Sequence, residues 1–294
     1  MMLRFLLLAC LLLAAPLGLR AIPAGDADGT LKALVARQNK LFAEAEKQGD
    51  QLDQDNFRSQ LQQLCNDYDV LLRDYPKLAA GFVAYGMLLN KVDMRKEAAE
   101  MFLQANRIDK NIPLVKNQLG NYLAEEGKPL EAVNYYLSAI QLEPKEPLYH
   151  YQLGTLLTEA RDDFLKSGQW TRETLDKAMH EGFRQAMELS PGSVTYAYRY
   201  GESFYDLEHP DWDEALEFWR ALELKVNPGV EKQTIRLHEA NILIKEDKID
   251  QAKDLMATVT EPVLQKQKQK LIDQLPKPKA EVEKKPAPAV PEKK

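Results

Sequence analysis

The sequence predicts an all-α protein built from repeated helix-turn-helix units. The strongest observation is that Gly86, Gly120 and Gly154 recur at intervals of 34 residues. A fixed period of this kind is typical of stacked helical hairpins, each of which is too small to bury its own apolar face. The chain is also rich in leucine at helical spacing and has few β-branched runs, which favours helix over strand throughout.

The unit at 113–146 shows why a glycine recurs. Gly120 falls on the expected first helix, where the missing side chain lets a second helix approach closely, and Gly127 marks the turn between the two. The second helix then carries three residues on one face, followed by a proline that blocks its continuation: Ala132, Tyr136, Ala139 and Pro144. This order of features resembles the tetratricopeptide repeat.

The resemblance implies a right-handed superhelical solenoid of helix-turn-helix units. The units are expected within 79–266, with these bounds: 79–112, 113–146, 147–193, 194–230 and 233–266. In the third unit Phe183 and Pro191 come 13 residues late, which predicts an insertion near 161–173. We expect this insertion to lengthen both helices of its unit and to project a hairpin with its tip at Ser167-Gly168. Its apolar residues, Phe164 and Trp170 among them, either pack against each other or contact a partner.

The flanks of the repeats are expected to be atypical, because terminal units face water on one side. The segment 22–78 should hold N-terminal helices that include a degenerate repeat, and Leu64, Tyr68 and Pro76 follow the second-helix pattern there. A final capping helix is expected at 263–275.

Both ends of the chain have the composition of segments outside a folded domain. Residues 1–21 hold Arg4, an apolar run and a small residue at Ala21, which predicts a secretory signal peptide. An uncleaved membrane anchor and a lipoprotein cysteine at Cys10 are the alternatives. The segment 276–294 has five prolines and six lysines among its nineteen residues, which predicts a disordered tail that can touch anionic envelope surfaces weakly.

The sequence offers no constellation typical of an enzyme, so we expect no catalysis, no cofactor and no metal site. Phosphate-binding loops, nucleophile elbows and paired metal-ligand motifs do not occur in it, and the four histidines are scattered. The formal net charge of −6, without basic stripes, argues against nucleic acid as a partner. If residues 1–21 are removed, Cys65 is the one cysteine left, which is either a core residue or a thiol that pairs with another chain.

The first helices offer a candidate groove. In the tetratricopeptide family these helices line a concave side, and residues one step around from the packing stripe face it. That rule, which the resemblance supplies, selects a stripe of carboxamides and tyrosines: Asn90, Asn117, Asn121, Tyr151, Thr155, Tyr198, Glu202, Tyr205 and Asn241. Carboxamides can pair with a peptide backbone of any sequence, and tyrosine offers a rigid apolar face with a polar tip. The stripe therefore predicts a groove for a protein or peptide partner.

These observations together predict an exported, non-enzymatic scaffold or adaptor in a bacterial cell envelope. A periplasmic chaperone that holds extended clients is one alternative. An accessory subunit of an envelope polysaccharide or cell-wall enzyme is another.

Overall fold

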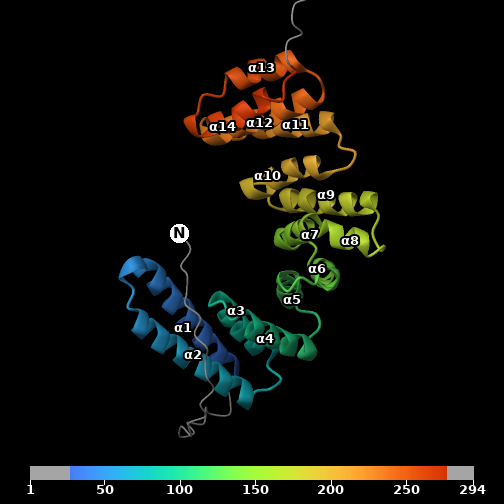
Figure 1. Ribbon diagram of the computed structural model, residues 1–294. Coiled ribbons are helices and arrows are strands. Elements are labelled where there is room, and N and C mark those ends of the chain that lie inside the picture. Colours follow the sequence, from blue (N-terminus) through green and yellow to red (C-terminus); the bar gives the residue numbers. More distant parts are fainter. Residues whose placement is uncertain (1–26, 277–294) are drawn as a thin grey trace, which may run out of the picture. The chain divides into compact units, whose positions relative to one another are not determined.

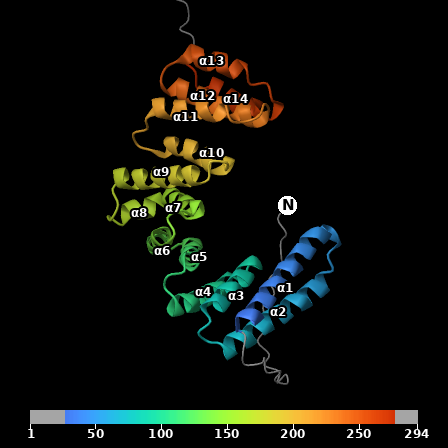
Figure 2. The ribbon, with the colours of Figure 1, turned by 180° about the vertical axis from the view of Figure 1, so that it is seen from behind.

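The computed structural model describes residues 27–276 and forms two compact units, which divide inside one helix between Tyr200 and Gly201. Within the described residues every regular element is a helix, as the sequence predicts (Figures 1 and 2). The predicted signal peptide and all but the first residue of the predicted tail lie outside the described residues.

The elements follow one another as helical hairpins joined by short turns. The first unit contains α1 (Ala27–Gln48), η1 (Gly49–Gln51), α2 (Gln54–Asp74), α3 (Ala79–Lys91), α4 (Arg95–Ile108), α5 (Pro113–Glu125), α6 (Pro129–Leu142), α7 (Pro147–Glu159), α8 (Arg161–Lys166), α9 (Arg172–Leu189) and most of α10 (Val194–Ser203). The second contains η2 (Phe204–Asp206), α11 (Trp212–Glu223), α12 (Val230–Lys245), α13 (Ile249–Ala257), η3 (Pro262–Leu264) and α14 (Gln265–Ile272).

Each signature glycine lies where the second helix of its hairpin presses against the first. A Cβ atom added to Gly86 would come within 2.7 Å of the Phe102 ring, and one added to Gly120 within 2.8 Å of the Tyr136 ring. Gly154 meets Phe183 and Gly201 meets Trp219 in the same way. Each glycine recurs because an aromatic ring of the second helix packs directly against the backbone of the first helix at that position.

The insertion in the third hairpin folds back instead of projecting. Of the two helices expected to lengthen, α9 does so, with 18 residues, but α7 ends at Glu159 and α8 is a separate short helix that contacts α6 and α7. Phe164 is fully buried and meets Trp170 edge to face, with 5.5 Å between ring centroids. The apolar residues of the insertion thus pack against each other, and the turn falls at Gly168, whose φ is +71°.

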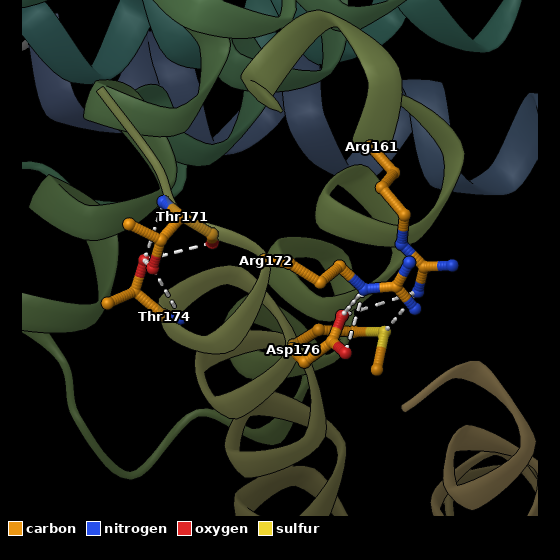
Figure 3. A network of polar contacts seen from close by, with 6 residues as sticks. Arg161, Thr171, Arg172, Thr174 and Asp176 are labelled. Atoms are coloured by element: carbon orange, nitrogen blue, oxygen red, sulfur yellow. Dashed lines mark hydrogen bonds and ion pairs between the residues drawn. The ribbon is translucent and has the colours of Figure 1, made fainter. Parts of the chain in front are cut away.

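A polar network fixes the start of the longer helix α9 (Figure 3). Thr171 caps the helix, since its hydroxyl accepts from the Thr174 backbone N–H at 3.2 Å. The Nε of Arg172 donates to both oxygens of the buried Asp176 at 2.8 Å, and the Arg161 guanidinium lies 3.9 Å from the same carboxylate. Because Arg161 begins α8, this network joins the insertion to α9.

The two ends of the repeats are closed by packed helices. Tyr68 of α2 stacks on Tyr85 of α3, with 5.1 Å between centroids, and burial raises the pKa of Tyr68 to about 12. Cys65 beside them is partly exposed and packs against the core. At the other end, η3 and α14 occupy most of the predicted capping segment and pack on α12, with Leu264 and Leu271 buried.

Candidate interaction surface along the first helices

The repeats can be compared through one reference residue in each first helix, which is the signature glycine or its equivalent: Gly86, Gly120, Gly154, Gly201 and Ala240. The predicted groove residues occupy three rows relative to this residue. They lie three positions before it, one position after it and four positions after it. The three rows differ in how exposed their side chains are.

The row three positions before the reference residue does not form an open surface. Asn117 is fully buried, and neither polar atom of its carboxamide has a hydrogen-bond partner. Leu237, at the same position in the last repeat, is 1% exposed. The prediction that Asn117 lines an accessible groove is therefore wrong.

Another residue of this row shows how such a position becomes covered. Tyr151, in the same row, contacts Tyr196 of the following first helix at 5.1 Å between centroids, and Phe183 at 5.8 Å. Tyr151 is thus covered both by the next first helix and by the second helix of its own hairpin. Tyr198 is partly buried as well.

The other two rows are more open. Asn90 and Glu202 are exposed, whereas Asn121, Thr155, Tyr205 and Asn241 are partly buried. The carboxamide oxygen of Asn121 accepts from the Tyr136 hydroxyl at 2.7 Å, which leaves its Nδ2 group as a donor. The Thr155 hydroxyl instead donates to the backbone oxygen of Tyr151 at 2.9 Å.

A fourth row, two positions before the reference residue, was not predicted from the sequence. Gln118 Oε1 accepts from Asn90 Nδ2 at 3.0 Å, and Arg199 Nη2 donates to Thr158 Oγ1 at 3.1 Å. In the second unit the Tyr205 hydroxyl donates to the backbone oxygen of His238 at 3.2 Å. We call each such contact an inter-repeat pair: the residue four after one reference residue meets the residue two before the next. Aligning the repeats on their reference residues would have revealed these positions.

A small polar recess adjoins the first inter-repeat pair. Asn90, Gln118 and Asn121 line it, together with residues of α4, and its volume is about 60 Å³. At its edge Arg95 bonds to Glu125 at 2.6 Å, and hydrogen bonds to Asp93 and Glu125 raise the pKa of Arg95. In the second unit Trp212 and Lys245 stand where Arg95 and Glu125 stand in the first, at the start of a second helix and the end of the following first helix. The Lys245 ammonium lies 5.1 Å from the centroid of the Trp212 ring.

The junction in the second unit is buried and aromatic. The His238 ring stacks on Trp219 with 4.2 Å between centroids, and burial lowers the pKa of His238 to about 4. Its neighbour Glu239 is 3% exposed, and burial, followed by repulsion from Glu223, raises its pKa to about 7. Burial also raises the pKa of Tyr205, so its hydroxyl stays protonated as a donor.

Within residues 27–276, no group of three or more histidine, cysteine or acidic side chains is arranged to hold a metal ion. A search of the same residues finds no helix with the length and apolar character needed to cross a membrane.

Solved structures share this fold. PilF of Pseudomonas aeruginosa superposes with a TM-score of 0.53 at 15% identity, over 79% of this chain and 91% of PilF. Naa15/Naa10 bound to HypK superposes with a TM-score of 0.51 at 16% identity, over 81% of this chain and 33% of the matched chain. YrrB, described as a TPR protein with an unusual peptide-binding site, gives 0.45 at 20% identity, over 65% of this chain and 93% of YrrB. No family model matches the chain, and no curated protein matches it. The fold is that of the tetratricopeptide repeat proteins.

Proposed function

We propose that the first helices of the first unit bind an extended segment of a partner protein, and that the protein is a non-enzymatic scaffold or adaptor. The observation that carries this proposal is the unused hydrogen-bonding capacity of three neighbouring carboxamides. Asn90 uses its Nδ2, Gln118 its Oε1 and Asn121 its Oδ1. The opposite end of each amide is left for a ligand, so the surface offers one acceptor and two donors.

A polypeptide in extended conformation fits this set of groups. Its backbone presents alternating carbonyls and N–H groups that need no particular side chain, and carboxamides can serve both. The first helices hold these groups on a packed frame, which lowers the entropic cost of binding. Because the recognition concerns backbone groups, it also supports the second candidate, a chaperone that accepts many extended clients.

The matched variants Asn121→Asp and Tyr136→Phe test the binding proposal. Asn121→Asp keeps an oxygen for the Tyr136 hydroxyl but removes the free donor. Tyr136→Phe removes the hydroxyl and leaves the donor in place. Fluorescence anisotropy with labelled, reduced and carboxymethylated α-lactalbumin, which cannot fold, measures capture of an extended chain. We expect Asn121→Asp to weaken capture about tenfold, and Tyr136→Phe to change it little. Equal capture by all three proteins would contradict the proposal.

Pull-down of partners separates the scaffold from the chaperone. A single partner recovered in stoichiometric amount supports a scaffold or an accessory subunit of an envelope enzyme. Many clients at low occupancy support the chaperone.

The cell envelope is the proposed location, on the strength of Arg4 and the apolar run that follows it in residues 1–21. Intact-mass measurement of protein recovered from the envelope fraction tests this. We expect a species that lacks residues 1–21, and a species that retains them would contradict cleavage.

A further inference from the structure

The C-terminal end of the chain has the opposite charge to the rest. Residues 262–294 contain nine lysines and four acidic residues, a formal charge of +5, whereas the whole chain carries −6. Residues 1–261 therefore carry −11. A polar outer face on a terminal helix keeps a repeat protein soluble, but either sign of charge would serve that purpose. Solubility alone therefore does not account for lysines gathered at one end of an acidic protein.

Three of these lysines lie on the described helix α14, which alternates glutamine with lysine over 265–270 and contains no acidic residue. Lys268 is partly buried, and its Nζ donates to the backbone oxygen of Val259 at 3.0 Å. Lys266 and Lys270 are exposed and stand one helical turn apart, so they share one face of the helix. Two ammonium groups of α14 thus point into solvent, and the third holds the helix to the chain that precedes it.

Apolar side chains border the two exposed lysines. Val263, one turn before Lys266, is 72% exposed, and Ile272 at the end of the helix is 37% exposed. Leu264 and Leu271 are instead buried where η3 and α14 pack on α12. The outward face therefore presents ammonium groups beside an apolar side chain that remains in water.

A lipid surface with anionic headgroups fits this combination. The headgroups attract the lysine ammonium groups, and the lysine stems and Val263 can enter the boundary between headgroups and acyl chains. A soluble polyanion would attract the lysines equally but would bury no apolar side chain. The one acidic residue in 262–276, Asp273, accepts from Gln269 Nε2 at 2.7 Å, so a glutamine holds it. The same headgroups repel the negative charge of residues 1–261, which confines the contact to the C-terminal end.

We propose that Val263, Lys266 and Lys270, which we call the C-terminal lysine face, form a docking surface for an anionic lipid membrane. The next lysines in the sequence, Lys277 and Lys279, add to the same attraction. With eight residues α14 is about 12 Å long, so it lies on the membrane surface and does not cross it. The C-terminal lysine face uses none of the carboxamides proposed to bind an extended chain, so the two proposals stand or fall separately.

Vesicle co-sedimentation tests this proposal with a chain that begins at residue 22, which contains every described residue and lacks the apolar run of 1–21. Vesicles of phosphatidylcholine are compared with vesicles of equal parts phosphatidylcholine and phosphatidylglycerol. We expect binding to the anionic vesicles alone, weakening steeply with added salt. Lys266→Gln combined with Lys270→Gln should weaken this binding about 25-fold, at about fivefold, or 1 kcal/mol, for each lysine.

A matched control removes the same charge from another part of the molecule. Lys96 and Lys145 are exposed lysines of the first unit, and changing both to glutamine should leave vesicle binding nearly unchanged. Both double variants should keep the melting temperature of the parent chain, since all four side chains are exposed. Equal binding by the parent chain and the Lys266→Gln, Lys270→Gln variant would overturn the proposal, and so would equal weakening by the two double variants.

Val263→Ser separates a membrane from a soluble polyanion, because it keeps the charge and removes the apolar side chain. We expect it to weaken vesicle binding about three- to tenfold and to leave retention on long-chain polyphosphate unchanged. If Val263→Ser binds vesicles as the parent does, while the lysine variant loses polyphosphate and vesicles alike, the partner is an anionic polymer and the membrane assignment is wrong.

Sedimentation velocity without lipid examines a second copy of the chain as the occupant. We expect the parent chain and the Lys266→Gln, Lys270→Gln variant to sediment alike. A parent dimer that this variant dissociates would show that the lysine face meets the acidic part of another copy, which would contradict docking to a membrane.

Discussion

The first and last inter-repeat pairs occupy equivalent positions and use different chemistry. In the first unit Asn90 meets Gln118 at a partly open surface, and each carboxamide keeps an unused end. In the second unit Tyr205 meets His238 in an aromatic cluster, where the histidine stacks on the fully buried Trp219. The difference shows that the repeat fixes which positions touch, whereas the residues at those positions decide whether the contact serves binding or packing.

The largest expected effect lies in the aromatic junction. Trp219→Ala removes a fully buried side chain that lies on both Gly201 and His238, so it should cost about 3–5 kcal/mol of unfolding free energy. Hydrogen exchange resolved by residue should show the loss first in α11 and α12. Trp212→Ala, at a partly exposed tryptophan, is the matched control and should cost less. If the two variants are equally stable, the second unit does not depend on this cluster.

The same junction contains two titratable groups whose effects on stability change with pH in opposite directions. The pKa of Glu239 is raised from 4.5 to about 7 in the fold, so its stabilisation is present below pH 4.5 and is lost as pH rises through 7. The pKa of His238 is lowered from 6.5 to about 4, so its stabilisation is present above pH 6.5 and is lost as pH falls through 4. Between about pH 4.5 and 6.5 the two dependences have opposite signs and nearly cancel.

The variant Glu239→Gln separates these two groups. Only the pH dependence that His238 causes should then remain, so that the free energy of unfolding rises by about 3 kcal/mol between pH 4 and 6.5. Chemical denaturation at several pH values measures this. A pH profile that matches the parent chain would show that Glu239 does not titrate in this window.

An intermediate effect is expected at the packed glycine of the second repeat. Gly120→Leu places a side chain where even a Cβ atom would approach Tyr136 to 2.8 Å, and should cost about 1–3 kcal/mol or more. Gly127→Ala meets no atom within 4 Å but must keep a φ of +70°, so its cost of about 1 kcal/mol comes from the backbone alone. Thermal melts compare the two, and equal melting temperatures would contradict the assigned helix packing.

The smallest effect is expected at the open junction. Asn90→Ala removes the hydrogen bond to Gln118 at a partly open surface, at a cost of about 1 kcal/mol. A melting temperature unchanged within error would show that the first inter-repeat pair contributes nothing to stability.

The helical hairpins could be predicted from sequence because their signal is local. A glycine and an aromatic residue at fixed spacing define which faces of two adjacent helices meet, and the pairs Gly86–Phe102 and Gly120–Tyr136 are found in contact. The break at Ala160 could not be predicted, since no proline or glycine marks the end of α7.

The candidate surface was harder to predict because it depends on the neighbouring repeat. A helix taken alone suggests that Asn117 and Tyr151 face outward, but Asn117 is fully buried and Tyr151 packs against Tyr196 of the next first helix. Gln118 belongs to this surface because it meets Asn90 of the preceding repeat, a contact that neither helix reveals alone. Contacts between repeats thus decide which polar groups are left for a partner.

We propose above all that carboxamides with an unused end on the first helices hold an extended chain. The most direct measurement follows the side-chain amide NMR signals of Asn90, Gln118 and Asn121 while carboxymethylated α-lactalbumin is added. We expect shifts at these three residues, with the exposed Asn134 amide on α6 unchanged. If the chain binds and these signals stay fixed while others move, the partner binds elsewhere and the claim is contradicted.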